Sequence, residues 1–441
     1  MPFSTGGSRC RLWAVLIGLG MFLAGCAGHV PYDTLDAHLS GGDCAAAQAL
    51  LAEHESDYGD NAVLLYLLDS AMVHMRCRQF GTAQENFRAA EDLAESLWTV
   101  SLSRELATYV TNDYVQTYAG EDFERAMIHL MSALAFLDEG RPDEALVECR
   151  RLDSLLVLLN DKYEEKNVYR EDAFGRYLSG ILREGDNDPD GAFIDYKKAV
   201  EAYGTYVSDY GVTVPEDLKA DLFRMAEKTG RMDDARLALP GYPGPPDRRD
   251  TLETGQVVWI ELRGRVPEKE EDRINIYTGH GPLTLAFPRY GRPVPPGPGQ
   301  TLTLTSAAGG VVTKTTDLVS DISAIAVKNL EDRRVRITAK AVARVAAKQA
   351  LIREIAKNDD KEVQRIVENV LNILNQFLER ADLRSWRSLP GRIYMTRIFL
   401  PPGTWQIVAE EGPRKIQKNL LVEAGQLKYI ISYDALGRAI Q

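Results

Sequence analysis

The chain has 441 residues, a formal net charge of −12, 26% charged residues and 45% hydrophobic residues. This is an ordinary globular composition, which excludes a collagen-like, mucin-like or wholly disordered chain. The acidic total argues against nucleic acid as a partner. The five cysteines are too few for a disulfide scaffold, and the length predicts two or three domains.

The first 25 residues have the pattern of a lipoprotein signal peptide. A positive segment precedes fourteen uncharged residues, 12–25, which are too few to span a bilayer. Residues 23–26, Leu-Ala-Gly-Cys, match a bacterial lipobox, so Cys26 is the predicted lipidation site; an ordinary signal peptide with a chance cysteine is the alternative. Lipid on Cys26 would hold the mature chain on a membrane. Ala27, in place of an aspartate, favours the outer membrane on its periplasmic side.

Charge divides the mature chain into two halves. Residues 27–240 contain 41 acidic and 20 basic residues, a net charge of −21, whereas residues 241–441 contain 23 and 30, a net charge of +7. The boundary coincides with a proline- and glycine-rich stretch that cannot continue a helix. We therefore predict a helical domain over 26–240, a linker over 241–254 and a second domain over 255–441.

The acidic half contains a repeated pattern in which an alanine is followed four residues later by a larger apolar residue. Ala83 with Phe87 and Ala192 with Tyr196 are the clearest copies; weaker copies start at Ala47, Ala145 and Ala235. Small residues let two helices approach closely, so the pattern predicts a tetratricopeptide-like stack of helical hairpins, with generic hairpins as the alternative. Such stacks commonly bind a protein or peptide on their concave face.

One acidic loop in this half resembles a calcium loop. Asp186, Asp188, Asp190 and Gly191 match ligand positions 1, 3 and 5 and the glycine of an EF-hand. Lys197 stands where the bidentate glutamate is required. The stretch also falls where the repeat needs a turn, so we interpret it as a turn and keep a weak cation site as the alternative.

The basic half alternates strands with two long helices. Residues rich in β-branched side chains predict strands near 256–262, 274–277, 283–287, 301–304, 311–313, 393–400, 405–408 and 427–433. Helical periodicity appears from about 321 to 357, on a basic stretch, and again from 362 to 380. The basic helix either packs on the sheet, lies on anionic lipid or contacts the acidic half. The predicted fold class is α+β multidomain, with a mainly antiparallel sheet after the all-α half.

Several strings resemble an uncharacterised family of bacterial lipoproteins with tetratricopeptide-like repeats. They are 118–125, 171–180, 381–386 with 389–390, and 400–403. The resemblance covers most of the mature chain and implies a secreted, lipid-anchored protein, with envelope or peptidoglycan biogenesis as the expected setting. It implies no catalytic residue. Within these strings we interpret Trp386 as a core residue, with a binding platform as the alternative.

No catalytic motif stands out, so we predict a protein that is not an enzyme and needs no cofactor. There is no H-E-x-x-H, C-x-x-C, G-x-S-x-G or P-loop. In the repeat register, Cys44 and Cys77 lie on the same edge of the stack, one repeat apart, which predicts a disulfide in the oxidising periplasm.

These observations favour a lipid-anchored periplasmic scaffold or adaptor whose acidic helical stack binds another envelope protein. The first alternative is a module in the C-terminal domain that binds a small molecule, lipid or glycan. The second is an envelope hydrolase that uses unrecognised carboxylates.

Overall fold

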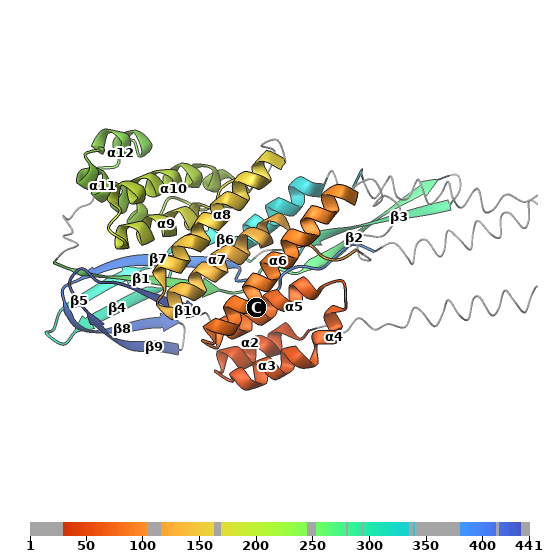
Figure 1. The fold of residues 1–441 in the computed structure, drawn as a ribbon, viewed down its shortest axis with the longest axis horizontal. Helices are drawn as coiled ribbons and strands as arrows, with labels where there is room; N and C mark the ends of the chain where they lie inside the picture. Colours follow the sequence, from red (N-terminus) through yellow and green to blue (C-terminus); the bar gives the residue numbers. More distant parts are fainter. Residues whose placement is uncertain are drawn as a thin grey trace, which may run out of the picture.

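The computed structural model describes residues 30–104, 116–162, 169–244, 253–278, 281–292, 294–334, 338–339, 380–411 and 414–433. Helices cover one face of a four-stranded sheet, and a second four-stranded sheet covers its other face (Figure 1). The architecture is mixed α+β, as the sequence predicts. The signal segment lies outside the described residues, and no described helix is long and apolar enough to cross a membrane.

The helical layer is a succession of paired helices. They are α2 (Tyr32–Ser40), α3 (Cys44–Glu53), α4 (Glu55–Tyr58), α5 (Val63–Arg76), α6 (Phe80–Arg104), α7 (Asp122–Glu139), α8 (Pro142–Lys162), α9 (Ala173–Gly185), α10 (Pro189–Tyr210), α11 (Glu216–Thr229) and α12 (Met232–Ala238). Local signals set their ends. Glu121 and Glu124 form a capping box at the start of α7, and Gly140, with φ 84°, ends that helix in the left-handed region.

The alanines of the predicted repeat occupy equivalent places, each in the second helix of a pair. All five are completely buried: Ala47 in α3, Ala83 in α6, Ala145 in α8, Ala192 in α10 and Ala235 in α12. A small residue is needed wherever two helices approach closely, in generic hairpins as well as in tetratricopeptide repeats. The tetratricopeptide-like assignment therefore stays a prediction.

The strands form three sheets. They are β1 (Gly255–Arg263), β2 (Lys269–Thr278), β3 (Gly281–Tyr290), β4 (Thr301–Ser306), β5 (Val311–Thr315), β6 (Asp317–Asp321), β7 (Arg392–Leu400), β8 (Gly403–Glu411), β9 (Arg414–Val422) and β10 (Leu427–Tyr433). The central sheet has the order β10-β1-β7-β6 and the outer sheet the order β5-β4-β8-β9. The β2–β3 hairpin extends away from both (Figure 1).

The structure corrects the sequence predictions for the basic half in two ways. Three sheets of the described residues replace the single expected sheet; their pairing is mainly antiparallel, as predicted, and β1 pairs with β10 in parallel. Strands β6 and β9 were not expected, since β6 has only five residues and the polarity of β9 does not alternate regularly. Residues 322–334 are helical as predicted, whereas most of the basic helix and residues 362–379 of the helix predicted over 362–380 lie outside the described residues.

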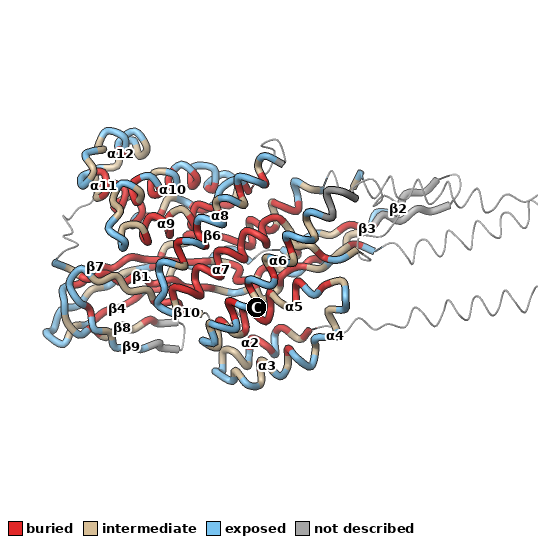
Figure 2. The backbone as a smooth tube through the Cα atoms, in the orientation of Figure 1, coloured by how far each residue is buried: buried red, intermediate tan, exposed pale blue. Residues whose placement is uncertain are grey.

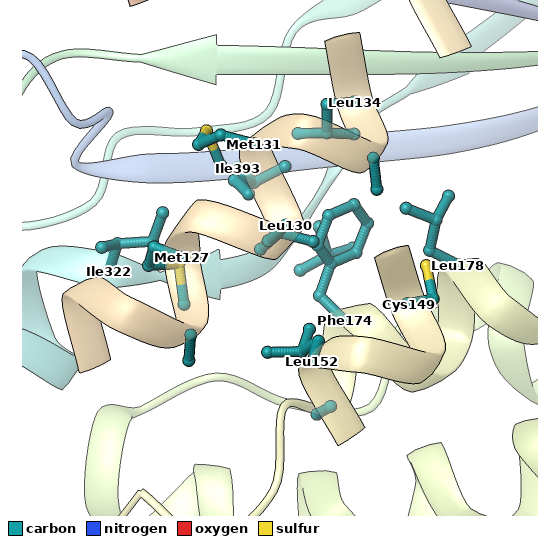
Figure 3. Packing of buried hydrophobic residues seen from close by; sticks show 14 of the residues in the cluster. Met127, Leu130, Met131, Leu134, Cys149, Leu152, Phe174, Leu178, Ile322 and Ile393 are labelled. Carbon is teal, nitrogen blue, oxygen red and sulfur yellow. The ribbon is translucent and has the colours of Figure 1, made fainter. Parts of the chain in front are cut away.

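One hydrophobic core joins the helical half to the central sheet. Every residue of α7 from Asp122 to Leu137 is buried, and Figure 2 shows this helix against the buried strands. In Figure 3, Phe174 packs among leucines of α7, α8 and α9, while Ile322 and Ile393 reach the same core from the sheet side. A second core, containing Trp259 and Trp405, fills the space between the two sheets. The predicted domain boundary at 241–254 therefore separates two parts that share a core.

A buried arginine on β7 connects this sheet to the helices. Arg397 has no exposed side-chain surface, and its guanidinium donates hydrogen bonds to Glu184 of α9 at 2.8 Å and Asp221 of α11 at 2.9 Å. It also donates to the Tyr196 hydroxyl of α10 at 3.1 Å and to Gln256 of β1. A buried charge is tolerated only when it is paired and hydrogen-bonded. These four partners on four elements meet that requirement.

A second arginine completes this network. Arg224 of α11 donates to Glu184 and, at 2.8 Å, to Asp221. Burial alone would raise the pKa of the Glu184 carboxyl, but the positive charges of Arg397 and Arg224 outweigh burial, so its pKa lies well below the usual range. Glu184 is therefore ionised in the folded protein at neutral pH.

We expect replacement of Arg397 by methionine to lower the free energy of unfolding by about 3–5 kcal/mol, because two buried carboxylates would share Arg224 as their one remaining cation in this network. The matched control is Arg236→Met, which removes an exposed arginine paired with Asp233 and should change stability by less than about 1 kcal/mol. Urea unfolding followed by circular dichroism measures both. Equal losses in the two variants would contradict the central role of Arg397.

The same network predicts a dependence of stability on pH. A carboxyl whose pKa is lowered by folding stabilises the protein above its unfolded-state pKa of about 4.3, and this stabilisation is lost as the pH falls through the folded-state pKa. We expect Glu184→Gln to be less stable than the parent at pH 7 and to lose less stability on acidification below about pH 4. If the variant lost as much stability as the parent on acidification, Glu184 would not be the source of the pH dependence.

Candidate functional site

The strongest candidate site is a groove among α6, α7 and α8, which we call the three-helix groove. It is open to solvent and has a volume of about 370 Å³. Its apolar lining is Ala94, Trp98, Ile128, Val147, Leu155 and Leu158. Its polar and charged lining is Glu91, Glu95, Arg125, His129, Arg150, Arg151 and Ser154. The sequence placed a protein-binding surface in this half of the chain but did not single out these residues.

The apolar side chains of α8 face solvent along the groove. Val147 is 44% exposed and Leu158 is 46% exposed, and they are eleven residues apart, which places them on the same side of a helix with 3.6 residues per turn. Leu152 and Leu156, on the opposite side of α8, are buried in the core. Helix α8 therefore carries apolar side chains on a side that faces solvent as well as on the side that packs in the core. Exposed apolar side chains of this kind favour contact with a partner.

Ion pairs fix the relative positions of the three helices. His129 of α7 lies 2.9 Å from Glu148 of α8 and 3.8 Å from Glu91 of α6. Arg151 of α8 lies 3.1 Å from the same Glu91, and the Arg125 guanidinium lies 5.0 Å from the centre of the Trp98 ring. The side chains around the apolar lining are thus held in place before any partner arrives.

The structure joins Cys44 and Cys77, the pair expected from the repeat register. The bond links the first turn of α3 to the residue that follows α5, with 5.7 Å between the Cα atoms and a sequence separation of 33. Cys149 is a free, buried thiol, and burial raises its pKa. Cys26, the predicted lipidation site, lies outside the described residues.

The calcium-loop residues do not converge. Asp188 accepts the backbone N–H of Gly191 at 2.9 Å and so caps α10, and it also pairs with Arg183. Asp190 pairs with Arg231, and Asp186 follows the end of α9. Within the described ranges, no three histidine, cysteine or acidic side chains form a group that could hold a metal ion. The structure therefore favours the turn interpretation.

Trp386 lies in the core, as expected. It is 1% exposed, its backbone N–H donates to Glu124 at 2.7 Å, and its indole N–H donates to the Ser388 hydroxyl at 3.0 Å. Its ring meets Phe87 of α6 edge to face. The tryptophan thus fixes the segment before β7 against the helices instead of offering a binding platform.

Three fully buried carboxyls have the raised pKa that enzymes often use in acid catalysis. Burial raises the pKa of Asp69, Glu124 and Asp172. Asp69 accepts hydrogen bonds from the hydroxyls of Tyr32, Tyr58 and Ser388, each at 2.5–2.6 Å. Asp172 caps α9 through Gly175. These carboxyls hold segments of the chain together beneath the surface, and none of the three lines the three-helix groove.

A further open cleft of about 460 Å³ lies beside α10. Arg170, Glu171, Lys198, Glu201, Thr205 and Asp209 are among its lining residues. The side chains that line this cleft include both acidic and basic residues, so their charge favours no particular class of ligand. Both clefts are lined by residues of the helical half.

No protein-family model matches the chain, and no curated protein matches it. Among solved structures, the crystal structure of BtubC (BKLC) from P. vanneervenii is similar to 49% of this chain and covers 82% of its own, with 16% sequence identity and a TM-score of 0.32. A TM-score of this size supports no inference about fold or function.

The disulfide predicts which thiols react. In non-reducing denaturant we expect alkylation to label Cys149 but neither Cys44 nor Cys77, as measured by peptide mass. Label on both Cys44 and Cys77 would contradict the bond.

Replacing Cys44 and Cys77 by alanine should lower the free energy of unfolding by about 3–4 kcal/mol, because the bond closes a loop of 33 residues in the unfolded chain.

Proposed function

We propose that this protein is a lipid-anchored periplasmic scaffold or adaptor, which binds another protein of the bacterial cell envelope through its helical half. The observation that carries the proposal is the three-helix groove, where exposed apolar side chains lie between charged side chains already held by ion pairs. Envelope or peptidoglycan biogenesis is the setting that we infer from the resemblance of the sequence to lipoproteins.

The groove has the composition of a protein interface. Burying a side chain such as valine or leucine is worth about 1.5–3 kcal/mol, so Val147, Leu158 and Trp98 together can supply much of the affinity for an apolar partner surface. Charged side chains at the rim orient the partner and contribute less to affinity. The net charge of −21 over residues 27–240 favours a partner with a basic or neutral surface.

The short stretch of chain between Cys26 and α2 would keep the helical half close to a lipid anchor. Helix α2 begins at Tyr32, six residues after Cys26. An extended chain spans at most about 3.6 Å per residue, so lipid on Cys26 would keep the start of α2 within about 22 Å of the attachment point. The helical half would then face partners close to the membrane surface.

The first test is binding in cells. We expect the Val147→Asp/Leu158→Asp double variant to lose at least about tenfold in recovery of the principal partner after crosslinking of the native lipoprotein and mass spectrometry, because charge would enter the apolar lining. Both side chains are exposed, so the variant should fold with nearly the stability of the parent.

The matched control is Val207→Asp, at a 50% exposed valine of α10 that does not line the groove. It should recover the partner as the parent does. Equal recovery by all three proteins would exclude the groove as the binding surface. Recovery of lipid or glycan alone would overturn the scaffold proposal and favour the binding-module alternative.

A further inference from the structure

The connection between β3 and β4 presents a proline-rich segment to solvent. We call residues 294–298, Val-Pro-Pro-Gly-Pro, the proline strap. All five residues are exposed, and Val294 alone exposes 63% of its surface. Four of the five have apolar side chains, although nearby connections such as 307–310 are made of small residues. A connection between two strands does not by itself require exposed apolar rings.

Side chains of the central sheet hold the backbone of the strap. Arg392 of β7 donates to the carbonyl oxygen of Val294, and the Tyr394 hydroxyl of the same strand donates to the carbonyl oxygen of Gly297 at 2.8 Å. Arg263 of β1 donates to the carbonyl oxygen of Pro298 at 2.7 Å. The strap is therefore fixed along its length by three side chains that leave its own side chains uncovered.

Both ends of the connection are fixed as well. The backbone N–H of Gly291 donates to the carbonyl oxygen of Glu268 at 2.9 Å. At the other end, Gln300 exchanges hydrogen bonds with Thr316, and Gly299 lies so close to the Thr316 carbonyl that a Cβ would meet it at 1.7 Å. Only glycine allows this approach.

The spacing of these contacts matches a polyproline II helix, which has three residues per turn. The carbonyl groups of Val294 and Gly297 are three residues apart and both face β7. Proline also restricts φ to the value that this helix requires. With the same period, Pro295 and Pro298 lie on one face of the strap, and both residues are exposed.

From this geometry we infer that the proline strap is a preformed polyproline II ligand for a protein partner with an aromatic-lined groove and an acidic rim. Proline-rich segments dock into such grooves because little conformational freedom is lost on binding. Here the freedom is already restricted by the contacts with Arg392, Tyr394 and Arg263.

The positive charge of Arg292 is the reason for expecting an acidic rim on the partner. Arg292 is exposed, and no acidic side chain among the described residues pairs with it. The other arginines around the strap are satisfied within the protein: Arg263 by Glu261, Arg392 by Asp321 and Arg289 by Glu270. Arg292, three residues before Pro295 in the sequence, is thus the cation available to a carboxylate of the partner.

The test uses an SH3 domain with an aromatic-lined groove and acidic flanking residues as the probe. It is titrated by calorimetry with the full chain in detergent. We expect saturable binding that weakens at least about tenfold in Pro295→Ala/Pro298→Ala. Arg292→Glu should weaken binding also, because it places an acidic group opposite the acidic rim. The control is Pro401→Ala/Pro402→Ala, which changes two exposed prolines in the β7–β8 turn and should leave binding unchanged.

Two results would overturn the inference. One is an absence of binding to the parent chain at about 1 mM probe. The other is equal binding by the parent and the Pro295→Ala/Pro298→Ala variant, with thermal unfolding showing that both are folded. Tighter binding of Arg292→Glu would overturn the acidic rim. The Val147→Asp/Leu158→Asp variant should bind the probe normally, so this test is independent of the three-helix groove.

Discussion

The requirement to satisfy one buried charge determines how the two halves of this molecule meet. The Arg397 guanidinium is removed from solvent on the central sheet, and its partners lie on α9, α10, α11 and β1. Separating the halves would remove one of the two cations that pair with Glu184 and Asp221, so the network favours one arrangement of helices on sheet over others that hydrophobic packing alone would allow. Asp217 of α11 strengthens this arrangement by accepting the backbone N–H of Arg397 at 2.8 Å.

The segment before β7 provides the second connection. Glu124 of α7 accepts the backbone N–H of Trp386, and Asp69 of α5 accepts the Ser388 hydroxyl. Arg384 donates to the carbonyl oxygens of Asn61 and Gln116, and these four contacts tie α5, α7 and the loops beside them to one segment. Ion pairs between the two halves, such as Lys269 with Glu121 and Arg397 with Glu184, use part of their opposite charge. The three-helix groove lies in the helical half, and the proline strap lies in the half that contains the sheets.

The pattern of the sequence predicted the positions of most helices and strands. The buried alanines of α3, α6, α8, α10 and α12 were visible because helix periodicity and close approach are local properties of the chain. Most strands were visible for the same reason. Strands β6 and β9 were missed since they are short or mixed in polarity and owe their conformation to pairing with β7 and β8. Of the candidate site, the sequence indicated only the helical half.

By itself, the sequence determined the charge asymmetry, and it indicated the alternation of helices and strands, the turn between α9 and α10 and the candidate pairing partner of Cys44, because each depends on residues close together or on one repeated period. Only the tertiary structure decided that Arg397 is buried, that Val147 and Leu158 are left exposed, and that Arg392 and Tyr394 hold the proline strap. The contacts of Arg397, Arg392 and Tyr394 join residues about 100 to 200 positions apart, and no local pattern encodes which distant side chains will meet.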